Sequence, residues 1–416
     1  MVMTEILHGG VAPTGTKFLR RLGRLATVLC ALAVAGCGGV SLNGGGSGDT
    51  GLAGGQSMTE NQVAELKAGG GGAKVALLLP LSAEGQAAIY ARSLKQAAEL
   101  ALFDTSNPSI VLIPKDTRGT PGGAQAAAQE AVRDGAELIL GPLFATEVKA
   151  VAPIARAANV PVIAFSSDRT VAGDGVLLLS FLPDQEVARV VSYAAGRGKK
   201  KFGALLPGTP YGQLVEQAMT ASVPRQGGKI VEVERFATSS SGLDEPVKRI
   251  GAAAKEGRIE TLMIGEGGDL LKAIIPMLAS AGVDRSQVQL VGTGLWDEPG
   301  VSSTPGLEGG WFAGPSPKAE EAFTQRYKSA YGVEPPRIAS LAYDAVSLAV
   351  ALGRGAPGER FTLTQLTNPE GFAGVDGLFR FLENGGNQRG LAVMEITPVG
   401  KRVIDPAPAR FSGAGL

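Results

Sequence analysis

From Lys74 onward, short apolar runs alternate with longer stretches in which apolar residues recur at helical spacing. The short runs are almost continuously apolar, which is typical of strands covered by helices on both faces. They read KVALLLP, SIVLIP, AELILGP, VPVIAF, KFGALLP, GKIVEVERF, TLMIGE and VQLVG. The helical stretches cover residues 86–103, 122–134, 147–158, 211–225, 243–256 and 269–281. These repeated units predict an α/β fold of doubly wound parallel sheets with right-handed crossovers.

The pattern continues for more residues than one hydrophobic core usually organises, so we expect two lobes. In open α/β sheets, ligands bind beyond the carboxyl ends of the strands. The loops that follow the predicted strands are therefore the candidate site. They are rich in Gly, Ser, Thr and single charged residues, and they cover residues 81–85, 142–146, 166–169, 208–211, 266–269 and 293–298.

An apolar run near the N-terminus, LATVLCALAVAGCGG at residues 25–39, follows a basic cluster of Lys17, Arg20, Arg21 and Arg24. This order predicts a secretory signal peptide, and the run is shorter than the roughly 20 residues that span a bilayer. Its last step, Val34-Ala35-Gly36-Cys37, resembles a bacterial lipobox. We therefore predict a lipoprotein signal peptide at residues 1–36 and a lipid on Cys37. The alternative is a plain signal peptide that leaves Cys37 as an incidental thiol.

Residues 37–73 are rich in Gly and Ser and show no hydrophobic periodicity. They predict a flexible tether with an r.m.s. span of about 30 to 35 Å. Gly38 stands where an Asp would retain such a lipoprotein at the inner membrane, so the resemblance implies the outer membrane. We expect a folded domain anchored by its lipid at the periplasmic face of the outer membrane.

The residues that most often carry catalysis or bind transition metals are scarce. The one histidine, His8, and the one other cysteine, Cys30, both lie in the predicted signal peptide. The mature chain would therefore lack histidine-based catalytic triads, His or Cys metal sites and an internal disulfide. The 39 acidic and 39 basic residues balance, which argues against nucleic acid as a partner. We expect no metal and no cofactor.

An enzyme would have to use carboxylate, Lys, Tyr or Ser chemistry alone. Glu84, Glu266 and Asp297 follow predicted strands, and a pair of carboxylates can hydrolyse a glycan. No spacing motif pairs them, and the glycine-rich runs lack the strand–GxGxxG–helix setting of a dinucleotide site. The sequence therefore favours a protein that is not an enzyme.

Four segments in order resemble the type I periplasmic binding proteins, the Leu/Ile/Val-binding family. They read KVALLLPLSAEGQ, AELILGPLFATEVKAVAPIARAANVPVIAFSS, GALLPGTPYG and EAFTQRYKSAYGVEPPRIASLAYDAVSLAVAL. The resemblance runs from Lys74 to about Asp405 and implies two lobes joined by three crossovers. It assigns residues 74–183 and 315–354 to the first lobe, 184–314 and 371–405 to the second, 355–370 to a crossover and 406–416 to a C-terminal tail.

The same resemblance implies which residues contact a ligand. Phe144, Ala145 and Thr146 match the loop that hydrogen-bonds a ligand carboxylate, and Ser166, Ser167 and Asp168 match the second such loop. Ser82, which follows the first strand, is also expected to contact the ligand. Tyr211 matches an aromatic residue that closes over the ligand from the second lobe. Two alternatives remain open: Thr146, beside Glu147, caps its helix, or Tyr211 packs beside Gly212 at a helix start. Tyr343 and Asp344, in LAYDAV, match a structural marker.

The chain departs from the family where amino-acid binders place an acidic residue and tyrosines around the ligand ammonium. Here it reads GEGGD and GTGLWDEPG. Glu266, Asp269, Asp297 or Glu298 could supply the negative charge, and Trp296 stands where its bulk could fill the ligand cleft. An amino-acid ligand is therefore left open.

Three segments, LLLPLS, ILGPLF and VPVIAFSSDR, also resemble a second branch, the penicillin-binding protein activators. These outer-membrane lipoproteins stimulate peptidoglycan synthases. We therefore predict a non-enzymatic, lipid-anchored periplasmic protein whose partner is a penicillin-binding protein synthase. The alternative is a solute-binding protein that delivers a branched-chain or other small amino-acid-like ligand to an ABC permease.

Overall fold

The computed structural model describes residues 72–411, apart from residues 107, 238–241, 299 and 302. The predicted signal peptide, the lipidation site Cys37 and almost all of the tether lie outside the described residues. Within them, no helix is long and apolar enough to cross a membrane.

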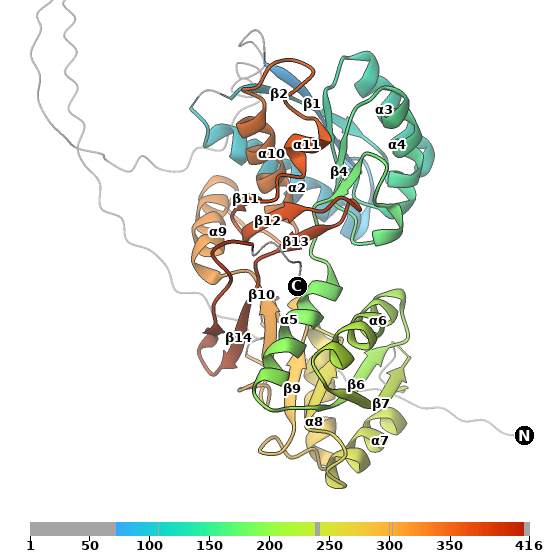
Figure 1. Ribbon diagram of the computed structural model, residues 1–416, viewed down its shortest axis with the longest axis vertical. Helices are drawn as coiled ribbons and strands as arrows, with labels where there is room; N and C mark the ends of the chain where they lie inside the picture. The colour runs from blue at the N-terminus through green and yellow to red at the C-terminus, as the bar shows by residue number, and fades with distance from the viewer. Residues whose placement is uncertain (1–71, 107, 238–241, 299, 302, 412–416) are drawn as a thin grey trace, which may run out of the picture. The chain divides into compact units, whose positions relative to one another are not determined.

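The first lobe is built on a parallel sheet whose strands are in the order β2-β1-β3-β4-β5 (Figure 1). The strands are β1 (Ala73–Leu79), β2 (Ile110–Asp116), β3 (Leu138–Leu140), β4 (Val162–Ala164) and β5 (Val176–Leu178). Its helices are α2 (Gly85–Phe103), α3 (Pro121–Arg133), α4 (Ala145–Ala157), α9 (Pro317–Tyr331), α10 (Ala339–Leu352) and the short α11 (Leu363–Leu366), with a 3-10 turn, η1, at Arg169–Val171.

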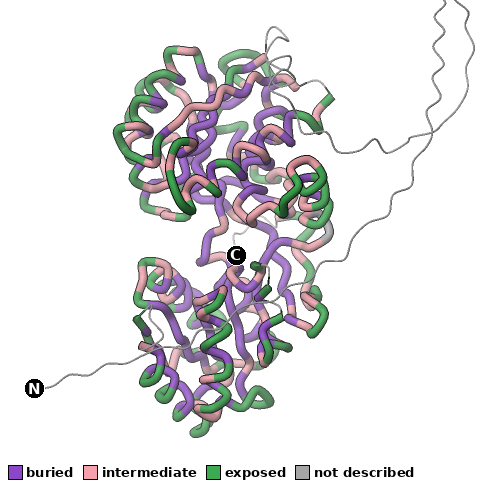
Figure 2. The backbone as a smooth tube through the Cα atoms, turned by 180° about the vertical axis from the view of Figure 1, so that it is seen from behind, coloured by how far each residue is buried: buried purple, intermediate pink, exposed green. Residues whose placement is uncertain are grey.

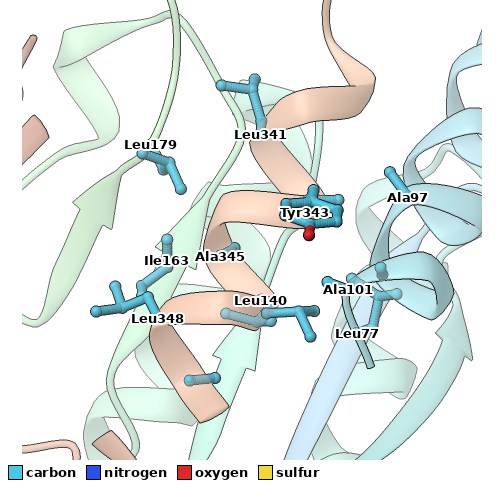
Figure 3. Close-up of a cluster of buried hydrophobic side chains, with 14 of the residues drawn as sticks. Leu77, Ala97, Ala101, Leu140, Ile163, Leu179, Leu341, Tyr343, Ala345 and Leu348 are labelled. Carbon is cyan, nitrogen blue, oxygen red and sulfur yellow. The ribbon is translucent and has the colours of Figure 1, made fainter. Parts of the chain in front are cut away.

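Side chains of β1 alternate between two hydrophobic cores, because successive residues of a strand point to opposite faces. Leu77 and its neighbours on the same face pack with α2 and α10. Ala76 and Leu78 pack with α3 and α4 on the other face. Figure 3 shows the first of these cores, in which Leu140 and Ile163 of the sheet lie against α10. The near-continuous apolar runs are explained by this two-sided burial.

The second lobe is built on a mixed sheet whose strands are in the order β15-β14-β10-β9-β8-β6-β7. The parallel strands are β6 (Lys201–Pro207), β7 (Lys229–Phe236), β8 (Thr261–Ile264), β9 (Gln289–Gly292) and β10 (Trp311–Gly314). Strands β14 (Ala392–Thr397) and β15 (Gly400–Asp405) run antiparallel at one edge. The helices are α5 (Pro183–Gly196), α6 (Pro210–Arg225), α7 (Asp244–Lys255) and α8 (Gly268–Ser280), and the 3-10 turn η3 covers Gly294–Asp297. Figure 2 shows the inner strands buried, with exposed residues on the outer sides of the helices.

Every strand and helix predicted between residues 74 and 292 is present, so the α/β prediction is confirmed. The predicted parallel arrangement holds for β6 to β10 of the second lobe, and the structure adds the antiparallel edge strands β14 and β15, which the apolar runs did not predict. Strand β15 reads GKRVID, which mixes charged and apolar residues, and such an edge strand lacks the apolar run that identified the others.

The third passage between the lobes differs from the prediction. Strands β11 (Phe372–Gly374), β12 (Gly377–Phe381) and β13 (Asn387–Arg389) form a separate small sheet. Phe379 and Phe381 of this sheet belong to the hydrophobic core of the first lobe. The chain therefore passes to the second lobe after β13, whereas the prediction assigned all of 371–405 to that lobe. The apolar contact that decides this depends on packing, which periodicity does not reveal.

Candidate ligand-binding site

Loops at the carboxyl ends of β1 and β2 are tied to each other by a carboxylate. The Ser82 backbone N–H donates to Asp116 Oδ1 at 3.2 Å, and the Arg118 N–H donates to the same oxygen at 2.8 Å. The side chain of Ser82 is exposed. A Cβ added at Gly119 would lie 3.5 Å from Ala83 and 4.0 Å from Phe144, so this loop borders the start of α4.

The first turn of α4 is capped by Glu147. Its buried carboxylate accepts a hydrogen bond from the Thr117 hydroxyl at 2.5 Å and from the Phe144 N–H at 3.2 Å. Burial raises the pKa of Glu147 more than these hydrogen bonds lower it. Thr146 is exposed and lies inside the helix, so the alternative that Thr146 caps α4 is wrong.

Backbone donors remain available at this helix start. The N–H groups of Glu147 and Val148 both donate to Phe144 O at 3.0 Å. An α-helix has no internal acceptors for its first N–H groups, and those of Ala145 and Thr146 make no hydrogen bond with the described residues, so they are available to a ligand. The positive end of the helix dipole lies there too, which favours an anionic group.

The second predicted loop lies beside the first, since the Phe165 N–H after β4 donates to Pro142 O at 3.0 Å. Ser166 is buried, and its hydroxyl oxygen accepts the Asp168 N–H at 3.2 Å. Ser167 is exposed. Asp168 accepts the Thr170 N–H at 2.9 Å, and the Thr170 side chain, followed by this backbone hydrogen bond, lowers the pKa of Asp168. Asp168 therefore caps η1 as an anion, whereas the Ser166 hydroxyl still has a proton to donate.

In the second lobe, Tyr211 lies in the first turn of α6. Its hydroxyl is 2.7 Å from Thr293 Oγ1, and burial raises its pKa, which keeps the phenol neutral. A Cβ at Gly212 would lie 1.9 Å from Pro207 O, so this glycine serves the close approach of α6 to β6. Tyr211 packs at the helix start and also reaches the loop after β9, so the two interpretations of this residue are compatible.

The four acidic candidates of the second lobe differ in what they contact. Glu266 is half-buried, accepts the Gly267 N–H at 3.0 Å, and has its pKa raised mainly by burial. Asp269 and Glu298 are exposed, and Asp269 forms a 2.8 Å ion pair with Lys272. The Asp297 side chain is only 1% exposed and forms a 2.5 Å ion pair with Lys401. Glu266 is therefore the candidate best placed to neutralise a ligand cation, and Asp297 is already neutralised within the protein.

Trp296 does not fill a ligand cleft. Its side chain is 1% exposed and lies in a core of the second lobe, where its indole N–H donates to Glu266 O at 3.1 Å. A Cβ at Gly292 would lie 2.1 Å from the indole ring, so the ring packs directly on backbone. The expectation that its bulk could fill the cleft is wrong. The missing side chain at Gly292 leaves room for the ring inside the lobe.

Tyr343 and Asp344 behave as the structural interpretation expects. The Tyr343 hydroxyl donates to Asp104 Oδ2 at 2.8 Å, and Asp344 Oδ1 accepts the Val375 N–H at 2.7 Å. Both residues are buried. The sequence did not single out three polar residues near this site: Thr293, which contacts Tyr211, and Glu186 and Arg337, which reach the neighbouring Gly294. Thr293 falls in a loop marked by its place after a strand, but Glu186 carries no signal beyond being an acidic residue in the first turn of a helix.

The arrangement thus has two groups of polar residues. The first lobe presents N–H and hydroxyl donors at Ala145, Thr146 and Ser166, which suit an anion. The second presents the phenol of Tyr211 and the carboxylate of Glu266, which suit a cation. Among the residues that the structure describes, no set of three or more His, Cys, Asp or Glu side chains could hold a metal ion.

Known proteins resemble this chain in sequence. A profile of the family described as "Periplasmic binding protein" matches residues 72–401. Leu/Ile/Val-binding protein homolog 6 of Brucella melitensis is 24% identical over 230 residues, which are 53% of this chain and 58% of that protein. The chain spans about half the length of the curated relatives it matches.

Solved structures share the fold over most of the chain. A Rhodospirillum rubrum protein provisionally named a branched-chain amino acid ABC transporter has a TM-score of 0.71 at 21% identity, covering 80% of this chain and 100% of that one. An ABC transporter solute binding protein from R. palustris, in complex with benzoate, has a TM-score of 0.60 at 18% identity, covering 83% and 100%. At such identities the similarity shows a common fold.

Proposed function

Because the chain belongs to the periplasmic binding protein family, whose members are generally non-enzymatic solute-binding proteins, we propose that it binds a small carboxylate-bearing solute without changing it chemically. The relatives reported above favour this alternative over the synthase activator that the sequence resemblance placed first. Their names refer to amino acids and benzoate, which both carry a carboxylate. The ABC permease that would receive the solute is part of the same proposal.

The start of α4 is the observation that carries the proposal. Free N–H groups at Ala145 and Thr146 and the hydroxyl of Ser166 are the donors that a carboxylate needs, and the helix dipole adds a favourable field. The second lobe supplies Glu266 for an ammonium group. A ligand that has both charges, such as an amino acid, would use both groups, whereas benzoate would use the first alone.

Calorimetric titration with leucine, isoleucine, valine and benzoate tests this. Ala145→Pro removes one free N–H, and the extended Phe144 before it, at φ −97° and ψ 142°, tolerates a following proline. We expect binding of every carboxylate to weaken about 10- to 100-fold, because a hydrogen bond to a charged group contributes about 1.5 to 3 kcal/mol. Ser166→Ala should act in the same direction.

Ala145→Ser, which keeps the N–H, is the matched control and should bind like the wild type. Glu266→Gln should weaken amino-acid binding and leave benzoate binding unchanged. Lowering the pH should also weaken amino-acid binding, because the raised pKa of Glu266 brings its protonation closer to neutral pH. Equal affinities of Ala145→Pro and Ala145→Ser would contradict the assignment of the carboxylate site.

The activator of a penicillin-binding protein stays a second candidate, supported by the lipobox and the Gly/Ser-rich segment at 37–73. An activator anchored at the outer membrane needs its tether to reach a synthase, whereas a solute carrier does not. Deleting residues 38–72 should abolish function if the protein is an activator. Complementation by the shortened protein would rule against that role.

Lipid anchoring at the outer membrane is part of the proposal and has its own test. Cys37→Ser should move the protein from the membrane fraction to the soluble periplasmic fraction, because the thiol that carries the lipid is lost. Cys30→Ser is the matched control and should leave the partition unchanged. A Cys37→Ser protein that still sediments with outer membranes would refute the anchor.

A further inference from the structure

Glu186 lies in the first turn of α5, just after the chain passes from the first lobe to the second. Its side chain is 4% exposed, and both of its carboxylate oxygens have partners. Oε2 accepts the Gly294 N–H at 2.8 Å, and Oε1 accepts a hydrogen bond from Arg337 Nη2 at 2.8 Å. One buried carboxylate therefore connects a loop of the second lobe with an arginine from the segment before α10.

The contact is close enough to require glycine at position 294. A Cβ there would lie 2.3 Å from Arg337 Nη1 and 2.4 Å from Glu186 Oε1. Any side chain would push the carboxylate or the guanidinium away. The loop backbone is thus held against the ion pair itself.

The next residue along this backbone touches the proposed ligand site. Thr293 is fully buried, and its Oγ1 is 2.7 Å from the Tyr211 hydroxyl. A continuous series of contacts therefore runs from Arg337 through Glu186 and Gly294 to Thr293 and Tyr211. The position of the Tyr211 hydroxyl depends on where the Thr293–Gly294 backbone is held.

Arg337 is itself fixed in place. Its guanidinium lies 3.7 Å from the centre of the Phe181 ring, and Phe181 belongs to the first passage between the lobes. A buried carboxylate that loses its cation is strongly disfavoured. Glu186 can therefore hold the loop as an anion only while Arg337 neutralises it.

We infer that Glu186 is a positioning residue of the ligand site: it fixes the Thr293–Gly294 backbone, and through it Tyr211, in a manner that requires Arg337. This inference rests on the proposed function for its consequence, the affinity for ligand. The geometry of the loop can be measured without any ligand, through a tryptophan in η3.

The experiment uses Trp296 as the reporter, because it lies in the same turn as Gly294. Trp311→Phe makes it the single tryptophan of the chain, since the protein has two. In this background we compare Glu186→Gln, Glu186→Ala, Arg337→Met and the double change Glu186→Gln with Arg337→Met, by Trp296 emission and by leucine titration. Glutamine keeps an acceptor for the Gly294 N–H and carries no charge that needs Arg337.

We expect Arg337→Met and Glu186→Ala to shift the Trp296 emission and to weaken ligand binding at least tenfold. The double change should restore the emission and most of the affinity, which a general loss of stability would not do. Glu234→Gln is the matched control: Glu234 is also buried and pairs with Arg249 at 2.7 Å, away from this turn. It should alter neither readout.

Unchanged Trp296 emission in Arg337→Met and Glu186→Ala would overturn the inference, as would a double change no better than Arg337→Met. If Glu186→Ala fails to fold, Arg337→Met and the double change still decide the matter. If the wild type binds no carboxylate of the panel, the proposed function fails, while the emission comparison still tests the role of Glu186.

Discussion

Replacing Arg389 with methionine is expected to lower the free energy of unfolding by about 3 to 5 kcal/mol at pH 8, because it leaves buried carboxylates without their cation. The Arg389 Nη1 atom lies 3.7 Å from Asp376 and 3.9 Å from Asp344, and all three side chains are 1 to 2% exposed. One guanidinium therefore serves two carboxylates from different elements, α10 and the turn after β11.

The pH dependence of the loss identifies its cause. Burial, together with the charge of Asp376, raises the pKa of Asp344 to about 7, and burial also raises the pKa of Asp376. A carboxyl group whose pKa is raised by folding contributes stability below its unfolded pKa, near 4, and loses that contribution as the pH rises through its folded value. The Arg389→Met protein should therefore be destabilised less at pH 5 than at pH 8, because Asp344, whose pKa is about 7, binds a proton at pH 5 and then needs no cation.

Urea unfolding at both pH values measures this effect. Arg402→Met is the control, since the Arg402 side chain is 66% exposed and its ion pair with Glu395 should contribute less than about 1 kcal/mol. The stability of Asp344→Asn relative to the wild type should rise between pH 5 and pH 8, because the amide needs no neutralisation. If Arg389→Met lowers the free energy of unfolding only slightly, or equally at both pH values, then charge does not hold Arg389, Asp344 and Asp376 together.

Replacing Trp296 with alanine should lower the free energy of unfolding by about 3 to 5 kcal/mol through the cavity it leaves. The indole is 1% exposed and lies against the backbone of Gly292 and Gly310, where a Cβ would approach its ring to 2.1 and 2.8 Å. Gly292 and Gly310 make room for this ring, and neither has a side chain that could fill the space when the ring is removed. The loss of the hydrogen bond to Glu266 O adds to the cost.

Thermal or urea denaturation with a second substitution tests the packing. Gly292→Ala should be destabilising in the wild type, because the new methyl group meets the ring. In the Trp296→Ala protein the same change should cost much less, since the ring is gone and the methyl group fills part of the cavity. Equal costs in both backgrounds would contradict the packing described here. Trp311→Ala, at a partly exposed ring that stacks edge-on with Tyr193 at 5.0 Å, should be the milder change.

Much of the fold follows from short-range patterns in the chain. Strand β1 could be predicted because its residues are buried on both faces, and α2 to α4 because their apolar positions repeat every three to four residues. The positions of the candidate loops follow as well, since the carboxyl ends of parallel strands share one edge of a sheet. Local order along the chain is sufficient for these features.

The sequence by itself therefore determined the α/β class, the order of the elements up to residue 292 apart from β5 and α5, and the loops in which a ligand site could lie. Tertiary structure alone decided which acidic side chains are already paired within the protein. Asp297 pairs with Lys401, 104 residues away, and Glu186 pairs with Arg337, 151 residues away. It also decided that Trp296 lies in the core and that β11 to β13 pack with the first lobe. Periodicity is a property of neighbours along the chain, whereas the partner of a buried charge or ring depends on which distant segments packing brings together.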